Sequence, residues 1–173
     1  ADTASANSAN EAFRRIESPA QAGRAAKVMR YKKPEMKRNK AFVPMAKSDV
    51  ILAAVQVMKS GGETTFHSHT GMDGFWFVLR GRARFYGGVV GGSGDELIAE
   101  CGQHEGVFLP RGVPYWFEQT GDEELEILQV EGFAKGEPNH TVHHNARGVA
   151  SGATEIIGQD GKTIDPATIT TEF

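Results

Sequence analysis

A chain of 173 residues with 39% hydrophobic and 24% charged residues is long enough for one soluble domain with an apolar core. Its formal net charge of −3 argues against general nucleic-acid binding, and no apolar run approaches the ~18 residues of a membrane span. The first ten residues lack the features of a signal peptide, and the single Cys101 has no internal disulfide partner. We therefore expect a cytoplasmic protein.

The N-terminal region, residues 1–41, predicts a helical arm. Capping boxes at residues 8–11 and 18–21 indicate two short helices, and Pro19 suits the first position of the second one. From Lys27 to Lys40 the chain is mostly basic. A solvated connecting arm is the favoured interpretation, and a patch for an anionic ligand is the alternative.

Residues 42–133 predict a β-barrel, because short strand-like runs alternate with turns rich in Gly and Pro. Strands are expected at about 49–58, 63–69, 74–79, 82–88, 95–100, 106–109, 114–119 and 124–133. Residues 134–173 are predicted to form a C-terminal extension that wraps the barrel. The Asp160-Gly161 pair within it is typical of a two-residue hairpin turn.

Two histidines, His67 and His69, stand two residues apart beside the apolar run 75–79. On an extended segment their side chains point to the same side. Two imidazoles on the inner face of a sheet need partners, and a metal ion is the obvious one.

This stretch resembles the cupin superfamily. Gly61, His67, His69 and Gly81 match its first motif, and the Pro110-Arg-Gly112 turn after Gly106 matches the centre of its second. The resemblance covers roughly residues 50–132. It implies an all-β fold, a cupin-type double-stranded β-helix (jelly-roll barrel), here with short N-terminal helices and the C-terminal extension.

The resemblance also implies a metal held by three histidines and a glutamate, and this chain departs from that set. Gly74 stands in the place of the glutamate, and Tyr115 stands in the place of the third histidine. Three arrangements are open. Asp73 completes a face of two histidines and one carboxylate, Tyr115 completes the set, or an outside histidine such as His104 or His140 does. A barrel without metal is the fourth possibility.

Further side chains are candidates for substrate binding. Trp76, Phe85 and Phe117 are predicted to line an apolar pocket, for which core packing is the alternative. Arg84 is predicted to hold a substrate carboxylate, unless it lies on an exposed sheet face.

The leading functional hypothesis is a metal-dependent enzyme acting on a small organic molecule, most plausibly a dioxygenase. His67, His69 and Asp73 would bind Fe, Mn, Ni or Zn, and Tyr115 and Asp73 would be catalytic. The alternatives are a metal-independent isomerase, cyclase or lyase that uses proton transfer by histidine and tyrosine, and a non-catalytic binding protein. The expected partners are a small-molecule substrate and a second copy in a homodimer, with no nucleic acid and no membrane.

Overall fold

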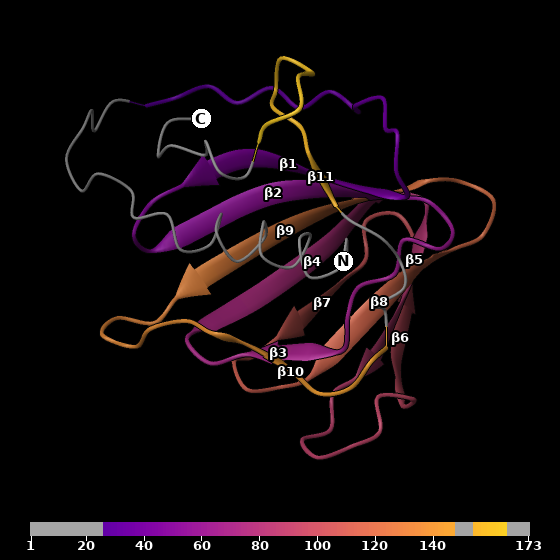
Figure 1. The fold of residues 1–173 in the computed structure, drawn as a ribbon, viewed down its shortest axis with the longest axis vertical. Coiled ribbons are helices and arrows are strands. Elements are labelled where there is room, and N and C mark those ends of the chain that lie inside the picture. The colour runs from indigo at the N-terminus through magenta and orange to yellow at the C-terminus, as the bar shows by residue number, and fades with distance from the viewer. Residues whose placement is uncertain (1–25, 148–153, 166–173) are drawn as a thin grey trace.

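The computed structural model describes residues 26–147 and 154–165, and within these ranges every regular element is a β-strand. The two predicted N-terminal helices lie outside the described residues. The strands form two sheets (Figure 1). The first sheet contains, in spatial order, β11 (Glu155–Ile156), β1 (Lys40–Lys47), β2 (Ile51–Met58), β9 (Leu125–Phe133), β4 (Met72–Arg80) and β7 (Gly106–Leu109). The second contains β10 (Thr141–His143), β3 (His67–His69), β8 (Tyr115–Thr120), β5 (Arg82–Gly87) and β6 (Leu97–Cys101).

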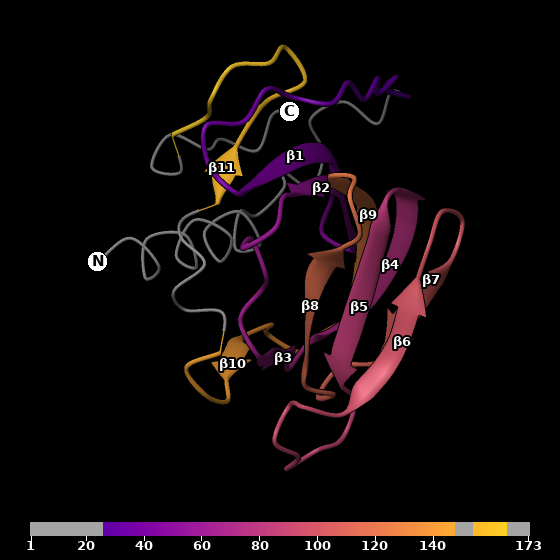
Figure 2. The same ribbon diagram turned by 90° about the vertical axis from the view of Figure 1, so that its right-hand side faces the viewer.

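The two sheets face each other across an apolar core, which gives the expected all-β barrel (Figure 2). Strand β4 shows why the sequence folds this way. Met72, Trp76 and Val78 are buried, whereas Phe75 between them is exposed. This alternation with a period of two places one face of the strand in the core and the other at the surface.

Most predicted strands are confirmed, with shifts of at most two residues at their ends. The expected strand at 63–69 is shorter, because only His67–His69 is regular. Thr64 lies along β8 instead, where its backbone N–H donates to the Phe117 carbonyl and its hydroxyl accepts from the Phe117 N–H. Strand β10 was not predicted, since the polar sequence of residues 141–143 has no alternation of its own and forms a strand by pairing with β3.

The arm before β1 is anchored by its apolar residues. Tyr31 and Met36 pack against valines of β1 and β2, and the Tyr31 hydroxyl donates a 2.6 Å hydrogen bond to Glu126. The basic side chains of residues 27–38 are exposed, which confirms that they are solvated. Lys40 differs from them, because it is buried at the start of β1 and its amine donates to the Glu63 carbonyl at 3.2 Å.

The described parts of the C-terminal extension lie against the barrel. Strand β10 pairs with β3, and β11 pairs with β1 in parallel. An antiparallel bridge between Ile157 and Thr163 flanks a turn over residues 158–161, in which the Gly161 N–H donates to the Gly158 carbonyl and Gly161 has a φ of 81°. The predicted Asp160-Gly161 pair therefore lies in a turn, but one residue later than its two central positions. Backbone N–H groups of Lys37 and Arg38 donate to the Glu155 carboxylate, so the arm and the extension lie side by side (Figure 2).

Gly74 allows a test of the core packing. A Cβ added at this position would sit 2.0 Å from Cζ3 of the buried Trp76 indole. We expect Gly74→Ala to lower the free energy of unfolding by about 1–3 kcal/mol, because a rigid ring has to move. Gly132→Ala is the matched control on β9, where an added Cβ meets nothing within 4 Å. Urea unfolding of both variants checks this, and equal stability of the two would contradict it.

The buried Lys40 predicts a pH-dependent stability. Burial lowers the pKa of Lys40 from 10.5 to about 8, and the charge of Glu63 opposes this only in part. Between these two values the unfolded chain holds the proton that the folded chain has lost, so the free energy of unfolding should rise as the pH rises. Lys40→Met should reduce this rise, by up to about 3 kcal/mol, while Lys32→Met at an exposed position should not. Unfolding curves between pH 7 and pH 10.5 make the comparison.

Candidate functional site

His67 and His69 lie inside the barrel on β3, with 7% and 3% of their surfaces exposed. Their ring centroids are 4.9 Å apart with a T-shaped arrangement. β3 lies between β8 on one side and β10 on the other, so both neighbours bring side chains toward the two rings. The structure thus brings the predicted pair together in a buried position.

The hydrogen bonding of His67 fixes its tautomer. Its Nδ1 lies 2.6 Å from the Thr65 carbonyl oxygen. A carbonyl can only accept, so Nδ1 carries the proton and donates it. In the neutral imidazole Nε2 therefore holds the lone pair, and it is the atom of His67 that can take up a proton.

Tyr115 joins the two histidines from β8. Tyr115 lies opposite His67 in the pairing of β3 with β8, and the ring centroids of the two residues are 4.7 Å apart. Its hydroxyl lies 3.4 Å from Nε2 of His69, and Nδ1 of His69 lies 3.5 Å from the Thr141 hydroxyl on β10. These are long contacts that a small shift of either ring would shorten. Two imidazoles and a phenol thus share one buried cluster.

Trp76 takes the space in which a glutamate at position 74 would lie. The six-membered edge of its indole covers Gly74, as the 2.0 Å approach of Cζ3 to an added Cβ shows. The indole centroid is 4.8 Å from the Tyr115 ring, so Trp76 belongs to the same interior. It is 1% exposed, and its Nε1–H is a buried donor with no hydrogen-bond partner. Leaving such a donor unpaired costs about 1–3 kcal/mol.

Two predicted site residues lie outside this cluster, which corrects their expected placement. Asp73 is exposed and accepts a 2.9 Å hydrogen bond from the Arg111 N–H, because β4 has no bulge at this point and residue 73 faces away from the core. Arg84 is exposed and forms a 2.8 Å ion pair with Glu100. Its position on β5 alternates with the buried Phe85 and so faces the surface.

Phe85 and Phe117 do face inward. They are fully buried, and their ring centroids are 5.0 Å apart. Both belong to the apolar cluster that also holds Trp76 and Tyr115. They therefore form the apolar wall next to the histidines, and their contact with a substrate stays a prediction.

The described residues do not supply the metal ligands that the resemblance implies. Within 26–147 and 154–165 there is no group of three or more His, Cys, Asp or Glu side chains that could hold a metal ion. Asp73 faces outward, and the place of the family's glutamate is filled by the indole. His67 and His69 alone are fewer protein ligands than a stable resident site uses. The donor set does not fit a resident metal.

Sequence reasoning missed a buried polar chain on the inner face of the first sheet. The side-chain amide N–H of Gln56 donates to the side-chain amide oxygen of Gln129. The side-chain amide N–H of Gln129 donates in turn to the carboxylate of Glu131, which is 0% exposed. Burial lowers the pKa of Lys47 to about 8, while the charge of Glu131 acts in the opposite direction. The sequence contained a sign of this chain. On β9, Gln129 and Glu131 lie an even number of residues from the core residues Leu125 and Ile127, so all four side chains point to the same inner face.

Strand β10 and the residue after it add two further histidines to the surroundings of the site. His143 is opposite His67 in the strand register, and the two ring centroids are 6.1 Å apart. Next to it, Nε2 of His144 lies 2.8 Å from the Ser68 hydroxyl. The C-terminal extension therefore contributes directly to the surroundings of the site.

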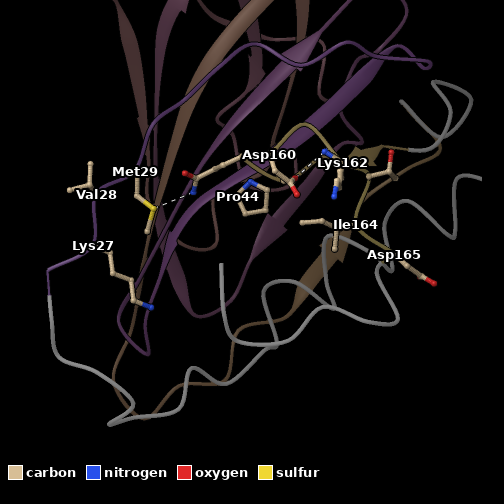
Figure 3. A pocket seen from close by; sticks show the side chains of 11 residues that line it. Lys27, Val28, Met29, Pro44, Asp160, Lys162, Ile164 and Asp165 are labelled. Carbon is tan, nitrogen blue, oxygen red and sulfur yellow. Dashed lines mark hydrogen bonds between the residues drawn. The ribbon is translucent and has the colours of Figure 1, made fainter.

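A separate cavity lies between the arm, β1 and the 158–165 turn (Figure 3). Its volume is about 920 Å³, and none of the predicted site residues lines it. Two lysines and two aspartates reach it, together with apolar side chains. The labelled lining residues are Lys27, Val28, Met29, Pro44, Asp160, Lys162, Ile164 and Asp165.

Comparisons with known proteins concern the fold. One similar solved structure is an uncharacterised conserved protein with a double-stranded β-helix domain from Klebsiella pneumoniae, at 14% identity and a TM-score of 0.56. The alignment covers 72% of this chain and 98% of that one. Another, the protein TT1209 from Thermus thermophilus, is 19% identical with a TM-score of 0.50, covering 60% of this chain and 90% of that one. At these identities the likeness extends to the fold alone.

No curated protein matches the sequence. Within the described ranges the chain contains no helix with the length and hydropathy that crossing a bilayer requires. The cupin domain model matches residues 54–131, which include both histidines, Trp76 and Tyr115. The two-sheet barrel and this match agree, and residues 54–131 have the fold and the sequence pattern of a cupin domain.

Proposed function

We propose that this protein is a cupin enzyme that transfers protons on a small carbonyl compound without a resident metal, as an isomerase or lyase does. The observation that carries the proposal is the buried cluster of His67, His69 and Tyr115. It combines a histidine of defined tautomer with a phenol whose hydroxyl lies 3.4 Å from a second imidazole. These are groups that act as general bases and acids in enzymes.

The chemistry follows from the protonation of each group. Nε2 of His67 takes a proton from the carbon next to the carbonyl group, and the electron pair of that C–H bond forms the double bond of an enol. Tyr115 gives its proton to the carbonyl oxygen, while the contact with His69 holds the phenol in place. With a 2-hydroxycarbonyl compound this enol is an enediol. The His67 imidazolium then gives its proton to the former carbonyl carbon, and the hydroxyl of the neighbouring carbon gives its proton to the Tyr115 phenolate and becomes the new carbonyl group. Both side chains are restored, so the reaction needs no oxidant or reductant.

The surroundings support this assignment. Trp76, Phe85 and Phe117 surround the cluster with apolar surface, which excludes water and strengthens each electrostatic contact. A buried phenol and imidazole are therefore shielded from solvent while the substrate is bound, and they exchange their own protons with solvent between turnovers.

The dioxygenase hypothesis remains the second candidate, because the position of His67 and His69 in the barrel is that of family ligands. It requires a third protein ligand or a ligand supplied by the substrate. Asp73 does not fill this role in the structure, since its carboxylate is bonded to the Arg111 backbone at the outer face.

Removal of the Tyr115 hydroxyl tests the proton-transfer proposal. In D2O, the wild-type protein should catalyse exchange of the C–H protons of at least one compound in a panel of small ketones, hydroxyketones and 2-keto acids, as followed by ¹H NMR. Tyr115→Phe should slow this exchange by about 10²–10⁴-fold, because the acid is lost. Tyr86→Phe is the matched control, since Tyr86 stacks on Trp116 and its hydroxyl is bonded to Glu118. An absence of exchange across the panel would refute the proposal.

Metal content separates the two candidates. We expect protein purified without chelator to carry Fe, Mn, Ni and Zn at well below one per chain, and dialysis against EDTA to leave the C–H exchange unchanged. Inductively coupled plasma mass spectrometry measures the first and NMR the second. One metal per chain that disappears in His67→Ala would contradict the proposal and favour the dioxygenase.

A further inference from the structure

The two tryptophans of this chain differ in how their indole N–H groups are used. Trp116 Nε1 donates a 2.6 Å hydrogen bond to the Gly94 carbonyl, and its ring lies between Tyr86 and the Arg147 guanidinium. Trp76 Nε1 is buried without any partner. Among buried side-chain N and O atoms of the described residues, only this atom and Nε of Arg147 lack a hydrogen bond.

The indole ring that carries this donor is buried in the barrel, against a residue of the proposed site. The edge formed by Cε3, Cζ3 and Cη2 covers Gly74. Nε1 lies on the opposite edge of the bicyclic ring and is therefore directed away from Gly74. The ring itself packs at 4.8 Å on Tyr115, which in turn contacts both histidines.

Core packing alone does not account for an indole at this position, since a partner is usual for a buried indole N–H. The other polar side chains of the barrel interior satisfy this rule. Gln56, Gln129 and Glu131 form a bonded chain on the strands next to β4. The indole N–H is the exception, and its ring packs on the ring of Tyr115.

We propose that Trp76 Nε1–H is a substrate-binding donor, and that it selects molecules with a carbonyl or carboxylate oxygen. This assignment deepens the proposed function and rests on it, because the bound oxygen is the one that Tyr115 protonates. With the oxygen held between the indole N–H and the phenol, the adjacent carbon lies beside the imidazoles. Trp76 is thereby a specificity-determining residue, and a molecule without an acceptor oxygen is rejected because the donor stays unpaired.

The indole N–H signals of the full-length protein test this directly, since a ¹H–¹⁵N spectrum contains one for each tryptophan. Acetone, acetate and pyruvate are the probes, and cyclopentane is the apolar control. We expect a saturable downfield shift of the Trp76 signal with at least one oxygen-bearing probe, no such shift with cyclopentane, and a constant Trp116 signal. A comparison of the shifts with acetone and with acetate shows whether the indole N–H binds a neutral carbonyl or a carboxylate.

Variants complete the test. Trp76→Phe keeps an aromatic ring. It should weaken the binding of the probe that shifts the Trp76 signal about tenfold, as expected for the loss of one hydrogen bond. Trp116→Phe should leave the affinity within about twofold. If the Trp76 signal responds to none of the three probes and the indole N–H contacts only bound water, the assignment is wrong.

The two proposals fail in different ways. If C–H exchange occurs while the Trp76 signal stays constant, the binding assignment is wrong and the proton-transfer function stands. If the Trp76 signal shifts but no compound exchanges its protons, Trp76 binds the oxygen and the proposed reaction is wrong.

Discussion

The close packing of the Trp76 indole over Gly74 is the contact on which the character of this barrel depends. Position 74 has no side chain, and the indole lies where one would be. The same ring then forms the wall against which Tyr115 packs. A carboxylate side chain at position 74 and the indole at position 76 cannot both occupy this space, so the packing of Trp76 excludes the glutamate that the family has there.

Burial explains why most polar side chains of the interior are hydrogen-bonded. An apolar barrel disfavours an unpaired polar side chain, and most of those present are held in hydrogen bonds. The Thr65 carbonyl fixes His67, and the chain from Gln56 through Gln129 ends at the Glu131 carboxylate. Among the described residues of the barrel interior, the indole N–H of Trp76 is a buried donor without a hydrogen-bond partner. The hydrogen bonds around it hold the other polar side chains in fixed positions.

The fold followed from patterns that are local in the chain. The strand-like runs at 74–79 and 124–133, the turns rich in Gly and Pro, and the two motif fragments were sufficient to predict the barrel and the place of the histidine pair in it. The alternation also implied that Trp76 faces inward and Phe75 outward, which the burial of β4 confirms. Asp73 was misplaced because its predicted inward direction required a bulge, and β4 keeps a regular register there.

The sequence alone determined that the chain forms a β-barrel with His67, His69 and Tyr115 in its interior, since strand period and motif spacing are properties of neighbouring residues. Only the tertiary structure decided which further groups join them. Strand β10 lies beside β3, and Glu131 lies opposite Gly74, through pairings between residues far apart in the chain. The direction of the Trp76 indole depends likewise on the space left by a glycine two residues away and by Tyr115 on another sheet. Such contacts have no local signature, because packing in three dimensions selects them.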